Sequence, residues 1–291
     1  MDVAKSLKVE NDALQGRVVV VTGATGGLGK EICSHLCALG AQVVALGRNQ
    51  AKLQNLVDVL KRNYPTSTVQ TLACDFEDLS SVKTACTTLS QTSIDALILN
   101  AGAYAIARKQ TVDGFDNVFQ INCVAPYLMT KLLLPTLEKS SLGRVVAVSS
   151  LAHTFTKIKG DDLQFQNCNN AEKVYGNAKR HLTLSLFALF DGKPNRLSIT
   201  HPGITPTGIT SHYPKWLQTL IKLPMKLIFS SPKKASLCIT KGVFTPCEFG
   251  EWIGPRIFKI WGKPKKSKIK GYVVGELQTA SSFVERAVLN I

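Results

Sequence analysis

Residues 17–40 read RVVVVTGATGGLGKEICSHLCALG, and this stretch decides the fold. Its run of valines is typical of a buried strand. Four glycines follow between residues 23 and 29, and then Ile32, Leu36 and Leu39 recur at helical spacing. The stretch therefore predicts a strand, a glycine-rich turn and a helix in direct succession.

The turn TGATGGLG, residues 22–29, has a composition that suits a bound phosphate group. Glycines permit positive φ, let the backbone approach a pyrophosphate closely, and leave amide donors and the positive helix end facing the anion. A plain tight turn is the alternative, but the flanking strand and helix favour a nucleotide site. The residues expected to contact the nucleotide here are Gly23, Thr25, Gly26, Gly27, Leu28 and Gly29.

Tyr175 and Lys179, in the segment YGNAK, are four positions apart, so a helix would place both on one face. A phenol titrates near pH ~10 in water, and a nearby ammonium favours the phenolate. We therefore expect Lys179 to lower the pKa of Tyr175 toward neutrality and make it a proton donor. A solvent-facing pair with no function is the alternative, and the glycine turn upstream argues against it.

The two motifs, in this order, resemble those of the short-chain dehydrogenase/reductase family over roughly residues 14–210. TGATGGLG looks like the family's cofactor turn, and Tyr175-x-x-x-Lys179 looks like its active-site pair. By the same resemblance, Asn100-Ala101-Gly102 is a cofactor-binding segment, and Asn122 is the asparagine of the proton relay. Ser150 is the catalytic serine, and Pro202-Gly203 with Thr207 is the loop that closes over the nicotinamide.

Ser149 and Ser150 are adjacent, and successive strand residues point to opposite faces, so only one of them can face the cofactor. Ser150 precedes Tyr175 by 25 positions, which is longer than the family's common spacing. The long spacing resembles the branch of retinol dehydrogenases and related steroid or carbonyl reductases. It favours Ser150 by register.

These residues also support a mechanism without the resemblance. A carbonyl group that accepts a hydride needs a donor to polarise its oxygen and a proton source to complete the alcohol. Ser150 and Tyr175 fill those roles. Lys179 would also hold the nicotinamide ribose, and Asn122 would fix a water that links Lys179 to solvent.

A hydrophobic carbonyl or alcohol, such as a steroid, retinoid or xenobiotic, is the expected substrate. One alternative is an enzyme on the same scaffold that reduces an activated C=C bond. Another is a nucleotide-sensing protein without turnover, against which the full set of four candidate catalytic residues argues.

The end of the second strand, in AQVVALGRN at 41–49, indicates which nicotinamide nucleotide is bound. An NAD site would place a carboxylate there to bind the ribose 2′-hydroxyl, but the chain has Arg48. A guanidinium suits a 2′-phosphate, and Lys30 could add a second cation, so we expect NADP(H) to be preferred over NAD(H). An ordinary loop charge is the alternative. Asp75 resembles the family's adenine-contacting aspartate, and a helix N-cap is its alternative.

Alternating strand and helix patterns predict a single-domain α/β fold, with a doubly wound parallel sheet and right-handed crossovers. The family resemblance implies a Rossmann fold with strand order 3-2-1-4-5-6-7. Helices are expected near 50–63, 79–90, 114–138 and 171–190, with the core at 14–210 and a substrate lid and basic region at 211–291.

Residues 212–229 carry an apolar stripe, Trp216, Leu217, Leu220 and Ile221, at helical spacing before Pro224. A helical substrate lid is the expected structure. A core helix is one alternative, and the other is a peripheral anchor whose apolar face, with Lys215, Lys222 and Lys226, would enter a membrane surface.

Lysines and arginines number 35 against 20 acidic residues, a net charge of +15, and the densest basic run is KPKKSKIK at 263–270. A solvated surface is the simplest interpretation, and no nucleic-acid-binding module accompanies the run. Eight scattered cysteines indicate reduced thiols rather than a metal site. Without a signal-peptide pattern at residues 1–16, we expect a cytoplasmic protein, and the resemblance implies a homodimer or homotetramer.

Overall fold

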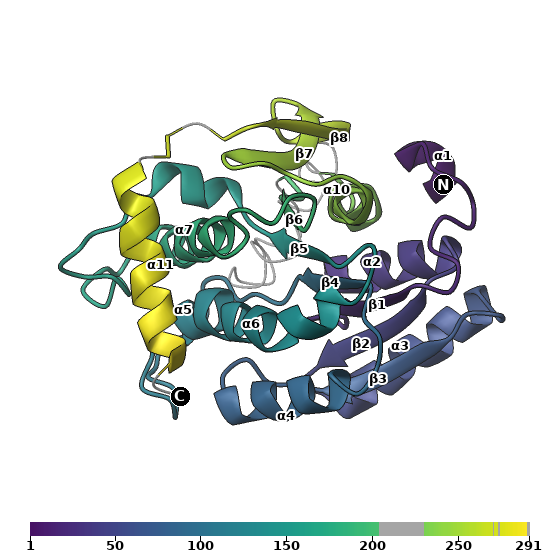
Figure 1. Ribbon diagram of the computed structural model, residues 1–291, viewed down its shortest axis with the longest axis horizontal. Helices are drawn as coiled ribbons and strands as arrows, with labels where there is room; N and C mark the ends of the chain where they lie inside the picture. The colour runs from purple at the N-terminus through teal and green to yellow at the C-terminus, as the bar shows by residue number, and fades with distance from the viewer. Residues whose placement is uncertain (204–229, 270, 273, 290–291) are drawn as a thin grey trace, which may run out of the picture.

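The computed structural model describes residues 1–203, 230–269, 271–272 and 274–289, and a sheet of eight strands forms its centre (Figure 1). The strand order is β3-β2-β1-β4-β5-β6-β7-β8. The first seven strands in this order run parallel, and β8 is antiparallel to β7. The strands are β1 (Val18–Val21), β2 (Gln42–Gly47), β3 (Val69–Ala73), β4 (Ala96–Leu99), β5 (Arg144–Val148), β6 (Leu197–Thr200), β7 (Glu251–Ile257) and β8 (Trp261–Lys268).

Helices cover both faces of the sheet. One apolar core joins the sheet to α4, α6, α7 and α11, and the other joins it to α1, α2, α3 and α10. The helical segments are α1 (Val3–Leu7), α2 (Gly27–Ala38), α3 (Gln50–Asn63), α4 (Leu79–Leu89), α5 (Asn117–Phe119), the π-helix η1 (Gln120–Val124), α6 (Ala125–Glu138), the 3-10 helix η2 (Leu151–Phe155), α7 (Ala171–Leu189), α10 (Pro232–Phe244) and α11 (Val274–Leu289). The predicted doubly wound architecture is confirmed.

Local sequence signals explain where most helices begin. Asn49, Asp78 and Asn170 cap α3, α4 and α7, each side chain accepting a hydrogen bond from a backbone N–H of the first turn. The predicted helices at 50–63, 79–90 and 171–190 therefore match α3, α4 and α7 closely. The helix predicted at 114–138 begins at Asn117 and is interrupted by the π-helix η1.

The last part of the described chain contains elements that the sequence patterns did not predict. The basic run at 263–270 was expected to be solvated surface, and residues 263–268 of it belong to β8, the outer edge of the sheet. Lys263, Lys265 and Lys268 are exposed there, and lysines on an edge strand oppose pairing with another chain. The predicted lid at 212–229 lies outside the described residues.

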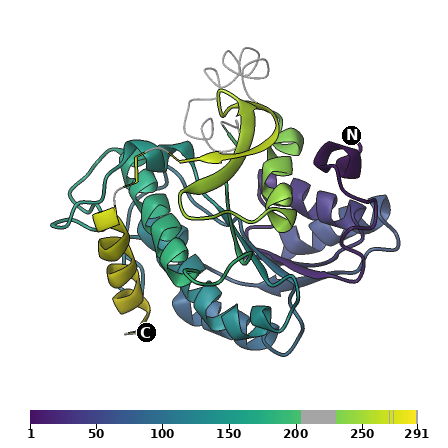
Figure 2. The same ribbon diagram turned by 45° about the horizontal axis from the view of Figure 1, so that its top comes forward.

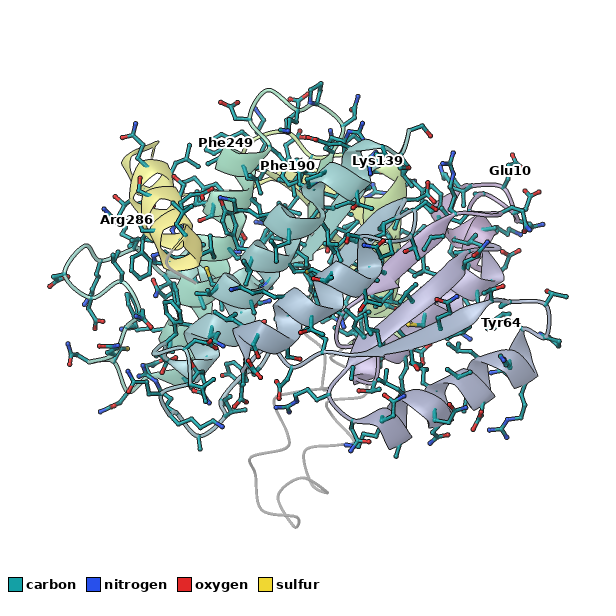
Figure 3. The ribbon with its side chains drawn as sticks, turned by 60° about the horizontal axis from the view of Figure 1, so that its bottom comes forward. Glu10, Tyr64, Lys139, Phe190, Phe249 and Arg286 are labelled. Atoms are coloured by element: carbon teal, nitrogen blue, oxygen red, sulfur yellow. The ribbon has the colours of Figure 1, made fainter. Side chains whose placement is uncertain are left out.

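Helix α11 packs along α7 and α6. The buried guanidinium of Arg180 on α7 forms an ion pair with Glu276, and Glu285 binds both Tyr127 and Lys131 of α6. Figure 3 shows Arg286 of α11 at one end of the molecule and Tyr64, which follows α3, at the other. Helix α11 therefore belongs to the same layer of helices as α6 and α7.

Within residues 1–203, 230–269, 271–272 and 274–289, no helix is both long enough and apolar enough to cross a membrane.

Candidate active site

The glycine turn is packed backbone against backbone. Gly23 has a φ of +62°, and a Cβ on it would lie 2.8 Å from Ala101 Cα. A Cβ on Gly29 would overlap the carbonyl oxygen of Gly23 and lie 2.8 Å from Ala24 Cα. Larger residues are excluded at both positions because backbone atoms cannot yield as side chains do. The turn is thus held against the loop that follows β4.

Helix α2 begins at this turn with open backbone donors. Its N-cap is Gly26, which supplies no capping hydrogen bond, in contrast to the capped α3, α4 and α7. Gly26 and Gly27 are exposed. Uncapped N–H groups at a helix start, with glycines that allow close approach, fit a pyrophosphate. Thr25 and Leu28 are half-buried in the same turn.

The segment Asn100–Gly102 links the turn to the residues deeper in the site. The Asn100 side-chain amide donates to the carbonyl oxygens of Thr22 and Gly23, at 3.0 and 3.1 Å. The N–H of Ala101 donates to Thr22 Oγ1 at 3.0 Å. A Cβ on Gly102 would lie 2.8 Å from Asn122 Oδ1 and 3.4 Å from Lys179 Nζ.

Asn122 lies in the π-helix η1 and is fully buried. Its amide donates to the carbonyl oxygens of Ala103 and Val118, both at 2.8 Å, and its oxygen accepts from the N–H of Ala103 at 3.2 Å. The side chain therefore fastens the loop after β4 to this helix. π-helical turns are frequent at functional sites.

Ser149 and Ser150 have opposite environments at the end of β5. The Ser149 hydroxyl is buried and binds His153 Nδ1 at 2.6 Å and Thr183 Oγ1 at 3.0 Å. Ser150 is half-buried, its hydroxyl oxygen accepts from the N–H of Ala152 at 3.3 Å, and its hydroxyl is near enough to Tyr175 to act on the pKa of that phenol. The structure thus brings Ser150, and not Ser149, to Tyr175.

Helix α7 carries Tyr175 and Lys179 into the same site. Lys179 is 2% exposed, its ammonium donates to the carbonyl oxygen of Val148 at 3.0 Å, and it lies 5.8 Å from the centroid of the Tyr175 ring. The ring of Tyr104 stands edge-on to Tyr175 with centroids 5.3 Å apart. Phenol, serine hydroxyl and ammonium therefore meet at the carboxyl end of β5.

The expected lowering of the Tyr175 pKa is wrong for this structure. Burial raises the pKa of Tyr175 to about 12, and the neighbouring Ser150 hydroxyl offsets only part of that rise. Burial also lowers the pKa of Lys179 to about 8. Desolvation disfavours the charged form of each group, and the sequence spacing does not reveal burial.

Arg48 and Asp75 lie together beyond the ends of β2 and β3. The Arg48 guanidinium is 3.3 Å from Glu77 Oε1 and 4.0 Å from Asp75 Oδ1, and its side chain is 64% exposed. Asp75 accepts from the N–H of Glu77 at 3.0 Å. The N-cap alternative for Asp75 is wrong, because Asp78 caps α4.

Pro202 and Gly203 follow the carboxyl end of β6, on the same side of the sheet as Ser150. Gly203 has a φ of +77°, and a Cβ on it would lie 2.9 Å from the carbonyl oxygen of Ile260. Thr207, the third residue expected in this loop, lies outside the described residues. Gly203 is therefore held against the turn between β7 and β8.

Several residues beside the site were not singled out from the sequence. The His153 ring stacks on Tyr272 at 5.6 Å between centroids and binds its hydroxyl through Nε2 at 3.1 Å. Arg180 donates to the carbonyl oxygen of His153 at 3.0 Å. Burial lowers the pKa of His153 to about 3, so the ring is neutral. The one signal in the sequence was nearness: Arg180 directly follows Lys179, and His153 is three residues after Ser150.

Arg108 explains how the chain accommodates the long spacing between Ser150 and Tyr175. Its guanidinium donates to Asp116 Oδ2 at 2.8 Å and to the carbonyl oxygens of Cys168 and Phe165, at 2.6 and 3.0 Å. The segment before α7 is thereby held next to Tyr175, where Phe165 packs with Val118 and Val174.

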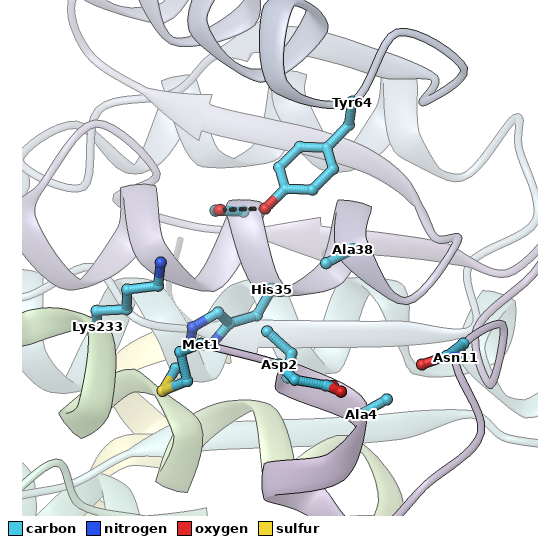
Figure 4. Close-up of a pocket in the computed structure, with 10 residues that line it drawn as sticks. Met1, Asp2, Ala4, Asn11, His35, Ala38, Tyr64 and Lys233 are labelled. Carbon is cyan, nitrogen blue, oxygen red and sulfur yellow. Dashed lines mark hydrogen bonds between the residues drawn. The ribbon is translucent and has the colours of Figure 1, made fainter.

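Two pockets in the described part of the chain lie away from this site. Figure 4 shows one of about 250 Å³ at α1, α2 and α10, with His35, Tyr64 and Lys233 among its walls. The dashed line there is the 2.9 Å hydrogen bond between Ser34 and Tyr64. The other, of about 470 Å³, contains Arg17 and Asp95, which precede β1 and β4 at the amino edge of the sheet. Neither pocket includes a candidate site residue.

Comparisons with known proteins identify the family of the chain. The family model of the short chain dehydrogenase matches residues 17–160. Polyprenol dehydrogenase from Homo sapiens is 30% identical over 242 residues, which cover 79% of this chain and 73% of that protein. Retinol dehydrogenase 14 from Mus musculus is 30% identical over 236 residues, which cover 75% of this chain and 71% of that protein.

Solved structures have the same fold. A crystal structure of an uncharacterized protein from Mycobacterium paratuberculosis has a TM-score of 0.69 and 25% identity, and the match covers 94% of both chains. A short chain dehydrogenase from Shigella flexneri 2a, solved in complex with NADP, has a TM-score of 0.60 and 23% identity over 79% of this chain and 93% of that chain.

Proposed function

The chain belongs to the short-chain dehydrogenase family and is an oxidoreductase, and from that premise we propose that it interconverts a carbonyl and a secondary or primary alcohol on an apolar substrate with NADP(H). The observation that carries the proposal is the meeting of Ser150, Tyr175 and Lys179 at the carboxyl end of β5, with the Lys179 ammonium 5.8 Å from the centroid of the Tyr175 ring. A bound nicotinamide nucleotide would supply the hydride. Its pyrophosphate fits the uncapped start of α2.

Ser150 is suited to polarise the substrate oxygen. Its oxygen already accepts the N–H of Ala152, which leaves the hydroxyl hydrogen to be donated. A donor fixed in this way stabilises the negative charge that develops on the substrate oxygen during reduction.

Tyr175 is suited to deliver the proton, and Lys179 to support it. With pKa values of about 12 and about 8, the phenol and the ammonium are both mainly protonated at neutral pH. Carbonyl reduction requires this state, because the phenol must give up a proton to the substrate oxygen. The nearby ammonium stabilises the phenolate that remains.

An apolar substrate is supported by the side chains around Tyr175. Tyr104 contacts its ring, and Tyr175 and Ile106 both pack against the apolar cluster that contains Phe165. Phe155, at the end of η2, is 77% exposed. Relatives named for polyprenol and retinol add weight to an isoprenoid or similarly apolar alcohol or carbonyl.

Preference for NADP(H) rests on Arg48. Its side chain is 64% exposed at the position where a carboxylate would serve NAD, and its acidic partners are at 3.3 and 4.0 Å. Arg48→Ala should weaken NADPH binding roughly tenfold and leave NADH binding unchanged. Lys109→Ala is the matched control, since Lys109 is 63% exposed and also pairs with Glu77. Similar wild-type affinities for NADPH and NADH would refute the preference.

The proposal is tested by following NADPH absorbance with a panel of retinoid, steroid, polyprenoid and simple aromatic carbonyls, and with an activated enone. Ser150→Ala should lower kcat/KM about 100-fold, whereas Ser149→Ala should leave kcat/KM near that of the wild type. Reduction of the enone's C=C bond alone, identified from the product, would favour the alternative reductase. NADPH binding without turnover on any compound would favour the sensor, and equal activity of wild type and Ser150→Ala would refute the assignment.

A further inference from the structure

The tip of the β7–β8 hairpin and its outer strand are rich in lysine and arginine and have no acidic residue. From Arg256 to Lys268 the chain reads RIFKIWGKPKKSK, with six cations and no acidic residue. Lys266 pairs with Glu251 at 2.9 Å, and the Lys259 ammonium lies 4.9 Å from the centroid of the Trp252 ring. Among the described residues, Arg256, Lys263 and Lys265 have no ion pair, and Lys268 lies opposite Glu251 in the strand pairing, where its charge helps to lower the pKa of that carboxyl group.

Large apolar side chains are exposed at the tip of the same hairpin. Phe258 is 83% exposed and Ile257 is 51% exposed. Trp261, at the start of β8, stands edge-on to Phe258 with ring centroids 6.5 Å apart. The tip is therefore apolar and aromatic, and the strand behind it is basic.

Phe258 has a left-handed backbone conformation, which glycine and asparagine adopt more readily than phenylalanine. Phe258 and Lys259 have φ values of 48° and 60°, and the N–H of Ile260 donates to the carbonyl oxygen of Ile257 at 3.0 Å. Consecutive positive φ values in a hairpin turn favour Asn and Gly, and a bulky residue with positive φ is an outlier. The chain presents an aromatic ring where stability alone would favour asparagine.

The tip lies on the side of the sheet where the parallel strands have their carboxyl ends, and the candidate site lies on the same side. Because β7 runs parallel to β6, its carboxyl end points the same way as the strand ends that precede Ser150 and Gly203. Gly203 packs against the carbonyl oxygen of Ile260, and Ser230 Oγ donates to that oxygen at 3.1 Å. Figure 2 shows the hairpin at the top of the molecule, next to α10.

Protection of the sheet edge explains only part of this arrangement. Lysines on β8 would suffice to oppose strand pairing, but an exposed Phe258 and Ile257 would promote association instead. Apolar side chains that enter the headgroup region, flanked by cations that attract anionic lipids, are the combination that binds a membrane surface.

We infer that the β7–β8 hairpin docks the protein on an anionic phospholipid surface. Phe258 and Ile257 enter the interface, and Lys263, Lys265 and Lys268 lie against the headgroups. An apolar substrate dissolved in the bilayer would then reach the adjacent site, a consequence that rests on the proposed function. Docking itself requires no turnover.

Flotation of the full chain with vesicles tests the inference. Vesicles of equal parts phosphatidylcholine and phosphatidylserine should bind the protein more tightly than phosphatidylcholine alone, and added salt should weaken binding. Phe258→Asn should bind roughly tenfold more weakly while unfolding at an equal or higher temperature, because asparagine suits the turn. K263Q/K265Q/K268Q should bind on the order of 100-fold more weakly.

Matched variants separate the hairpin from general surface properties. Val112→Asn removes an apolar side chain that is 87% exposed elsewhere, and K61Q/R62Q/K139Q removes the same amount of charge from exposed positions. Both should bind as the wild type does. The inference is overturned if these controls lose as much binding as the hairpin variants, if Phe258→Asn binds normally, or if the protein retains nucleic-acid duplexes but no vesicles. A flotation result is independent of any activity result, so the two proposals fail separately.

Discussion

In the glycine turn, residues 22–29, the close contacts join backbone atoms, whereas around Ser150 and Tyr175 they join side chains from distant parts of the chain. Gly23 and Gly29 are fixed by their nearness to Ala101 and to the turn itself. Beside the candidate catalytic cluster, hydrogen bonds run from Ser149 through His153 to Tyr272, 119 residues away from His153. The nucleotide end is thus specified locally, and the catalytic end is specified by tertiary packing.

Their electrostatics differ in the same way. The start of α2 offers uncapped backbone donors at the surface, a fixed dipole with no titrating group. The catalytic end buries Lys179 and a neutral His153, whose pKa values burial lowers. Changes to packing should therefore affect the second region more than the first.

The largest effect should come from breaking the buried link between α7 and α11. Arg180→Met leaves Glu276 without the guanidinium it pairs with, which should lower the free energy of unfolding by about 3–5 kcal/mol. NADPH affinity of the folded fraction should remain near that of wild type, because the glycine turn is not involved. Urea denaturation and NADPH fluorescence titration measure both quantities.

The ion pair of Lys193 with Glu138 is the control, since both side chains are at least 40% exposed. Lys193→Met should change stability by no more than about 1 kcal/mol. Glu276→Gln, which keeps hydrogen-bonding capacity, serves if Arg180→Met does not fold. Equal losses from the exposed and buried pairs would contradict the difference between the two regions.

A smaller effect, confined to the first region, is expected for Gly29→Ala. The added Cβ overlaps backbone atoms of the turn, so the variant should lose about 1–3 kcal/mol of stability and bind NADPH much more weakly. Gly160→Ala is the matched control, because nothing lies within 4 Å of a Cβ there. Normal NADPH binding by Gly29→Ala would show that the turn does not hold the nucleotide.

The smallest effect is the pH dependence of Lys179 in the cofactor-free protein. Its folded-state pKa of about 8 is below the unfolded value, so between these values the unfolded chain binds more protons and stability rises with pH. Relative to Lys179→Met, the wild type should gain on the order of 2 kcal/mol between pH ~8 and ~10. Parallel stability curves would mean that Lys179 is not desolvated.

The sequence predicted the sheet well up to β6, because valine-rich strands, capped helices and glycine turns are local signals. The family resemblance implied a seventh strand, which the observed strand order confirms as β7, but no residue pattern placed it, and β8 was not predicted. Gly254 and Pro255 interrupt the β7 pattern, and β8, in which four of eight residues are lysines, pairs along one edge only. The candidate residues were found from motifs, but the raised pKa of Tyr175 and the contacts of Arg180 depend on burial and on α11, which no local pattern reveals.

The most direct test of the account is a comparison of Tyr175→Phe with wild type, measuring NADPH affinity and kcat on any carbonyl that the wild type reduces. Removing the hydroxyl should lower kcat by about 1000-fold, within the range for loss of a general acid. NADPH affinity should stay within about twofold, because the glycine turn is intact. Full activity in Tyr175→Phe would contradict the assignment of Tyr175 as the proton donor.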